Sequence, residues 1–148
     1  MPLCENAFDR MRANFERIAH GDKPSGCVIG TLTKEQLDAL NRMRAAHQPP
    51  LPPVKSEVLF YGRHLYRSRV VRDGYTVEDV LDQIASAMDE ASVLAQNPRM
   101  TVLQNPHGRA DRYGNIVRDL AVLECTAHHP RPELFSVMPK GDKNKPET

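Results

Sequence analysis

The side chains best suited to chemistry in this sequence are cations in its central and C-terminal parts. They are Arg63, Arg67, Arg69, Arg72, Arg109, Arg112, Arg118 and Lys140. The planar guanidinium fork of arginine matches phosphate, so arginines carried on a sheet can form a phosphate-binding face even in a neutral protein. The alternative is a solvated strand face that pairs with acidic side chains elsewhere.

His64 lies within the densest part of this set, between Arg63 and Tyr66. Imidazole is the commonest general acid or base near neutral pH, and the flanking arginines would favour its neutral, proton-accepting form. We therefore consider His64 a candidate general base. A histidine on a surface, or one hydrogen-bonded in the core, is the structural alternative.

Cys125, His128 and His129 form a second group of reactive side chains. Cys-x-x-His is half of a zinc site, but His107 is the only recruit for the other half, so no metal site is predicted. His128 is considered instead as a proton-donating partner for His64 and as a substrate-binding residue. The chain has no phosphate-loop, dinucleotide or HExxH pattern, so no cofactor is expected.

These candidates depend on a helix and several strands for their positions. Thr76 and Asp79 form a capping box that begins a helix over 76–91. Its apolar residues recur at helical spacing: Val77, Val80, Leu81, Ile84, Met88 and Ala91. Its other residues make the helix acidic.

The remaining pattern of the core is that of strands. We expect strands at 58–61, 100–104, 116–126 and 133–138, and a break at Gly62. Residues 64–71 are predicted to continue extended, with His64, Tyr66 and Ser68 on one face and Leu65, Arg67 and Arg69 on the other. The predicted fold class is α+β: an antiparallel four- to five-stranded sheet crossed by one helix.

A mostly helical annex precedes this core. Apolar residues predict a helix over 4–19, and Thr33 with Gln36 forms a capping box for a second helix. Consecutive prolines after Gln48 then indicate an extended spacer. The predicted divisions are the annex (1–48), the linker (49–53), the α+β core (54–142) and a disordered tail (143–148).

The composition of the 148-residue chain excludes several classes of protein. Its net charge is +1, so nucleic-acid binding would need a local basic patch. No apolar run is long enough for a membrane span, so no membrane partner is expected. Three scattered cysteines give no disulfide framework and suit a reducing compartment. We expect a cytoplasmic protein.

Three segments carry a resemblance to a known group. GRHLYRSRVVRDGYTVEDVLDQIASAM, DRYGNIVRDLAVLECT and PRPELFSVMPKGD together resemble the barnase–EndoU–colicin–RelE group of ribonuclease toxin domains, especially members from phage and mobile elements. The resemblance covers about residues 57–142. It implies metal-free RNA cleavage through attack of the ribose 2′-hydroxyl, and a cognate antitoxin or immunity protein as a partner.

The resemblance also implies roles for particular residues. His64 would be the base, Arg69 and Arg118 would hold the scissile phosphate, and Lys140 would stabilise developing charge. Tyr66 would stack on or hydrogen-bond the substrate. Arg67, Arg112 and His128 complete the expected substrate contacts. No second histidine occupies a matching motif, so the resemblance assigns no general acid.

The sequence-based hypothesis is thus a metal-independent ribonuclease of toxin type with RNA as its substrate. Two alternatives remain open at this point. One is a non-enzymatic interaction protein of a mobile element that binds a protein or nucleic acid through its basic sheet and N-terminal helix. The other is an immunity-type protein that binds a basic toxin through the acidic helix.

Overall fold

The computed structural model describes residues 3–95, 101–126 and 129–141. Its helical segments are α1 (Ala7–Ala19), α2 (Lys34–Ala46), α3 (Arg63–Leu65), the π-helical segment η1 (Tyr66–Arg72) and α4 (Val77–Ala87). Its strands are β1 (Cys27–Thr31), β2 (Glu57–Phe60), β3 (Val93–Ala95), β4 (Thr101–Gln104), β5 (Arg109–Ala110), β6 (Ile116–Glu124) and β7 (Glu133–Gly141).

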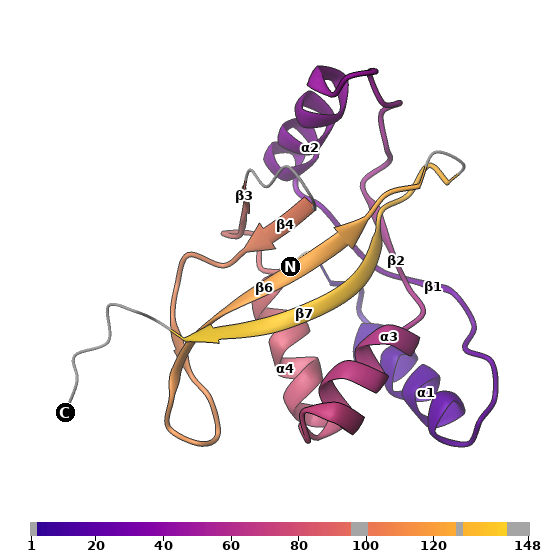
Figure 1. Ribbon diagram of the computed structural model, residues 1–148, viewed down its shortest axis with the longest axis vertical. Helices are drawn as coiled ribbons and strands as arrows, with labels where there is room; N and C mark the ends of the chain where they lie inside the picture. Colours follow the sequence, from indigo (N-terminus) through magenta and orange to yellow (C-terminus); the bar gives the residue numbers. More distant parts are fainter. Residues whose placement is uncertain (1–2, 96–100, 127–128, 142–148) are drawn as a thin grey trace.

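The strands form one strongly curled, mixed sheet in the order β1-β2-β7-β6-β4-β3, with the short β5 paired to β6 (Figure 1). The α+β class is therefore confirmed, but the expectation of a purely antiparallel, four- to five-stranded sheet is wrong in two respects. β1 adds a strand from the N-terminal third by pairing antiparallel with β2. β2 and β7 pair in parallel, with Leu59 opposite Glu133.

The N-terminal third shares the core of the rest of the chain. Met11 and Phe15 of α1, Ile29 of β1 and Leu40 of α2 belong to the same buried cluster as Ile84 of α4. α1 lies beside β1 and α4, and α2 lies beside β3 (Figure 1). The independence of a 54–142 core stays a prediction, and this shared packing argues against it.

The segment after β2 differs most from its prediction. Residues 63–72 are helical in α3 and η1, not extended. Leu65, Ser68 and Arg69 are its buried side chains, at the i, i+3 and i+4 spacing of one helix face. Burial of that face against the sheet decides the conformation, and the extended prediction with alternating faces is wrong.

Other local predictions are confirmed. Thr33 with Gln36 and Thr76 with Asp79 form complete capping boxes at the starts of α2 and α4. The apolar stripe of α4 is buried from Val80 to Met88, although the helix ends at Ala87 instead of continuing to residue 91. The strands expected near 100–104, 116–126 and 133–138 appear as β4, β6 and β7.

None of the helices in the described ranges has the length and apolar character that a membrane crossing requires.

Candidate functional site

A glycine turn connects β2 to α3 and places the first residues of the candidate site. Gly62 has a φ of +92°, a conformation that L side chains rarely adopt. A Cβ there would also lie 2.7 Å from the Phe60 ring. Glycine is thus required twice, by the backbone and by the space. α3 begins directly after this turn and lies beside β7.

The residue before this turn, Tyr61, is held by the N-terminal third of the chain. The buried Asn14 side chain donates hydrogen bonds to the carbonyls of Ser25 (2.8 Å) and Tyr61 (3.3 Å). The Tyr61 ring lies so close to Gly26 that a Cβ on that glycine would be 2.6 Å from a ring atom. The backbone and the ring of Tyr61 therefore have defined positions, and 39% of the residue remains exposed.

His64 lies on the first turn of α3 with its ring against β7. Its ring stacks on Phe135, with centroids 4.2 Å apart and planes inclined by 12°. Its Nε2 lies 3.3 Å from the Ser68 hydroxyl one helical turn later. These two contacts orient an imidazole that remains exposed to solvent.

An irregularity in β7 presents the Phe135 ring to this histidine. Leu123 of β6 pairs with Leu134, but Val122 pairs with Ser136, so Phe135 is an extra residue in the β7 register. Such a bulge changes the direction of a side chain and is frequent beside functional sites. Leu134 stays in the core while Phe135 is exposed.

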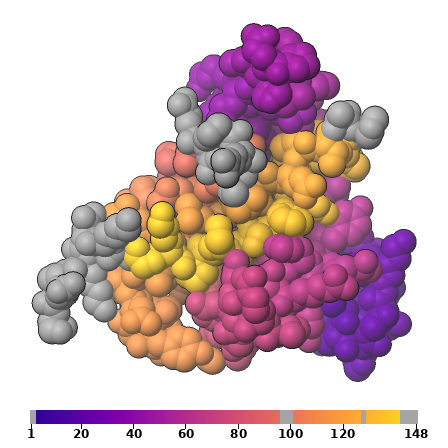
Figure 2. All heavy atoms as spheres, viewed as in Figure 1, coloured from indigo at the N-terminus to yellow at the C-terminus, as the bar shows by residue number. Residues whose placement is uncertain are grey.

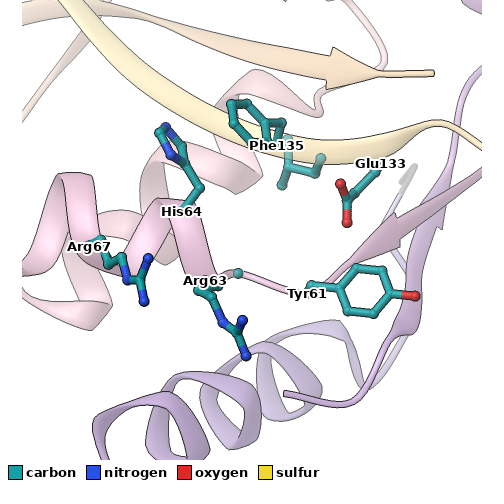
Figure 3. Close-up of a pocket in the computed structure, with 8 residues that line it drawn as sticks. Tyr61, Arg63, His64, Arg67, Glu133 and Phe135 are labelled. Atoms are coloured by element: carbon teal, nitrogen blue, oxygen red, sulfur yellow. The ribbon is translucent and has the colours of Figure 1, made fainter. Parts of the chain in front are cut away.

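A hollow of about 280 Å³ lies between α3 and the start of β7. Its lining residues are Tyr61, Gly62, Arg63, His64, Arg67, Glu133, Leu134 and Phe135. In Figure 3 the guanidinium groups of Arg63 and Arg67 extend from the helix, and Glu133 and Phe135 lie across from them on β7. On the face shown in Figure 2, the yellow atoms of β7 lie directly above the magenta atoms of residues 63–72.

The charges in this hollow are only partly compensated. The ion pairs among the described residues involve neither Arg63 nor Arg67. Glu133 is the acidic residue among those that line the hollow. Burial raises the pKa of the Glu133 carboxyl, and the nearby Glu124 raises it further. A proton is therefore retained on Glu133 to a higher pH than on an ordinary glutamate.

Two of the residues assigned a catalytic or substrate-binding role from the sequence lie at this hollow. His64 and Arg67 both line the hollow. Arg69 is buried instead, where its Nε donates to the Val137 carbonyl at 2.6 Å and its Nη1 pairs with Asp73. Its role is to join η1 to β7, so its guanidinium is already occupied.

Tyr66 also lies away from the expected substrate position. Its ring is partly buried beside Phe15, with centroids 6.0 Å apart. It packs between η1 and α1 because residues 63–72 are helical. The expected face shared by His64 and Tyr66 depended on an extended strand.

The remaining candidates lie elsewhere. Arg118 of β6 and Lys140 of β7 face each other across the pair of strands. Lys140 is five residues from Phe135, or roughly 16 Å along the strand. Arg112 pairs with Asp79 (3.3 Å) and donates to the Tyr113 hydroxyl (2.7 Å). His128 falls outside the described residues.

Tyr61, Glu133 and Phe135 were not recognised as site residues from the sequence. The parallel pairing of β2 with β7 brings them together, and no local pattern signals it. Arg63 was recognised only as one of many arginines. The i, i+4 spacing of Leu65 with Arg69 and of Arg69 with Asp73 is a signal in the sequence that favours a helix over 63–72. On such a helix, Arg63 and Arg67 lie on a different face from Arg69.

Within the described ranges, no three His, Cys, Asp or Glu side chains are arranged to hold a metal ion. Comparison of the chain with family models, with curated proteins and with solved structures gives no match.

Proposed function

We propose that the hollow between α3 and β7 binds single-stranded RNA and cleaves it without a metal ion. The observation that carries this proposal is the combination in one hollow of an oriented histidine, a carboxyl with a raised pKa, two arginines outside the ion pairs, and exposed aromatic rings. Proton transfer, phosphate binding and base stacking each need one of these features.

The reaction needs a base and an acid on the two sides of one phosphate. His64 takes the proton from the ribose 2′-hydroxyl, whose oxygen then forms a bond to phosphorus. The bond from phosphorus to the 5′-oxygen breaks, and Glu133, whose pKa is raised by burial and by Glu124, gives a proton to that leaving oxygen. The products are a 2′,3′-cyclic phosphate and a free 5′-hydroxyl.

Arg63 and Arg67 hold the phosphate in this scheme. They lie one helical turn apart on the face that borders the hollow, so their positive charges can meet the phosphoryl oxygens as charge develops in the transition state. This assignment replaces Arg69, which is bonded to Asp73 and Val137, and Lys140, which is too distant to share the same phosphate. A cytoplasmic location would suit such a substrate.

The test is cleavage of a fluorescently labelled single-stranded RNA by the purified full-length chain in EDTA. We expect cleavage, and we expect an RNA with 2′-deoxyribose at the scissile position to be resistant. His64→Ala and Glu133→Gln should each lower the rate about a hundred- to ten-thousand-fold.

Two arginines of the same helical segment provide a matched pair for this test. Arg67→Ala should weaken both binding and turnover, and the weakening should lessen as salt is raised. Arg72→Ala should leave both unchanged, because Arg72 is exposed, lies outside the hollow and pairs with Asp73. Wild-type protein that binds RNA but cleaves none of it would overturn the enzyme proposal and favour a non-enzymatic RNA-binding role.

A further inference from the structure

A second hollow of about 190 Å³ adjoins the first at Tyr61 and Glu133, which line both. The other residues that line it are Leu59, Glu124, Thr126, His129 and Arg131. The two hollows therefore lie on the two sides of one shared wall. A polymer bound in the first would present its neighbouring groups to the second.

The ends of β6 and β7 bring two carboxylates into this second hollow. Glu124 lies directly opposite Glu133 in the pairing of the two strands. Like charges placed opposite one another in a sheet are unfavourable, so this pair does not contribute to the stability of the strands. Glu124 is exposed, and no ion pair among the described residues engages it. It is therefore available as a hydrogen-bond acceptor.

His129 adds a donor of defined orientation. The Arg131 backbone N–H lies 3.2 Å from His129 Nδ1 and donates to it, so the neutral ring carries its hydrogen on Nε2. The Arg131 side chain, which also lines the hollow, donates to the Glu57 carboxylate at 3.0 Å, so its charge is partly compensated there. The second hollow thus offers an acceptor at Glu124, a donor at His129 and an aromatic ring at Tyr61.

We propose that this second hollow is a base-specificity subsite that takes a nucleobase with an exocyclic amino group, next to the phosphate held by Arg63 and Arg67. This inference rests on the proposed function. The amino group of cytosine, adenine or guanine donates to the Glu124 carboxylate, and the base stacks on Tyr61. Uracil has no amino group to donate to the Glu124 carboxylate, so it is disfavoured.

Tyr61 separates the two hollows, so that a phosphate in the first hollow and the adjacent base in the second occupy different sites. The Tyr61 carbonyl accepts a hydrogen bond from Asn14 and its ring lies against Gly26, so the wall between the hollows has a defined position. Glu133 faces the phosphate side in the proposed reaction, and Glu124 is left to recognise the base.

The experiment is equilibrium binding of the full-length protein to short labelled 2′-deoxy oligonucleotides, which lack the attacking hydroxyl. Each is an oligo-dU with one central dU, dC, dA or dG. We expect the three amino-bearing bases to bind about fivefold to a hundredfold more tightly than dU, the range for one good base contact. Glu124→Ala should remove this preference, and the control Glu35→Ala, an exposed glutamate on α2, should retain it.

The outcomes separate this inference from the proposed function. Equal binding of the four oligomers, or no binding of any, would overturn the subsite whether or not RNA is cleaved. Retention of the preference in Glu124→Ala would overturn it as well. A preference that is lost in Glu124→Ala supports the subsite even where the wild-type protein cleaves no RNA, in which case only the catalytic proposal fails.

Discussion

Arginines that look equivalent in the sequence have different roles because of the helix face on which each one lies. Arg67 and Arg69 are two residues apart, yet Arg67 is exposed at the hollow and Arg69 is 9% exposed beneath the sheet. Side chains two residues apart on a helical segment point to roughly opposite sides of it, which accounts for this difference. The Arg69 guanidinium donates to the Val137 carbonyl and pairs with the Asp73 carboxylate. A buried cation needs such partners to offset the loss of its hydration. Arg69 is a structural residue, whereas Arg67 is the arginine that we propose binds phosphate.

Glu133 leads to a prediction about pH and stability. Its pKa in the folded protein lies above the ordinary value of 4.5, chiefly because of burial and also because of Glu124. Above pH 4.5 the folded state therefore binds more protons than the unfolded state, so stability falls as pH rises through the raised pKa. Well below pH 4.5 Glu133 is protonated in both states, so it no longer makes the stability depend on pH.

Glu133→Gln should remove this slope. We expect the variant to gain stability relative to the wild type as pH rises from about 4.5 to neutral, and to show no such gain below that range. Urea unfolding across this pH series measures it. A variant that is less stable than the wild type at neutral pH would contradict the assignment of an unfavourable charge at this position.

At the scale of elements, the site is built where β2 ends and α3 begins. The turn at Gly62 places His64 against β7, and the bulge in β7 turns Phe135 toward it. The rare π-helical geometry of η1 follows immediately, and π-helical segments are frequently found at functional sites. Without the turn at Gly62 or without the bulge in β7, the His64 imidazole and the Phe135 ring would lie apart.

Two glycines with the same backbone requirement test this turn. Gly62 and Gly74 both have positive φ angles, +92° and +80°. A Cβ at Gly62 meets the Phe60 ring at 2.7 Å, whereas a Cβ at Gly74 meets nothing within 4 Å. Gly74→Ala should cost about 1–2 kcal/mol for the left-handed conformation. Gly62→Ala should cost about 1–3 kcal/mol more, because the core is overpacked.

Chemical unfolding of both variants at one pH gives the comparison. Equal losses in the two variants would show that the Phe60 ring moves aside without cost, and the turn would then not fix the position of α3.

For the whole molecule, the N-terminal third completes the core. Its five large buried side chains are Met11, Phe15, Ile29, Leu32 and Leu40. At about 1.5–3 kcal/mol each, their burial contributes roughly 7–15 kcal/mol, which equals the whole stability of a typical domain. The same third supplies β1 to the sheet and Asn14 to the candidate site.

A chain that begins at residue 49 should therefore lose its cooperative unfolding transition and should not cleave RNA. Circular dichroism during thermal unfolding, with the full-length chain as control, measures this. A cooperative transition in the truncated chain would instead support the independent 54–142 domain that the proline-rich linker suggests.

Local interactions could be predicted from the sequence because they depend on residues a few positions apart. The capping boxes at Thr33 and Thr76, the buried stripe of α4 and the break at Gly62 are of this kind. The α+β class followed from them, and His64 and Arg67 were recognised as candidate site residues from their types alone.

The conformation of 63–72 and the composition of the hollow were decided by tertiary structure. A short segment with Val70, Val71 and several arginines is compatible with either a strand or a helix, and burial of Leu65 and Arg69 against β7 selects the helix. The parallel pairing of β2 with β7 joins Leu59 to Glu133 across more than seventy residues. That long-range pairing brings Glu133 and Phe135 close to His64. It could not be predicted from a local pattern, because the free energy that selects it is distributed over the entire core.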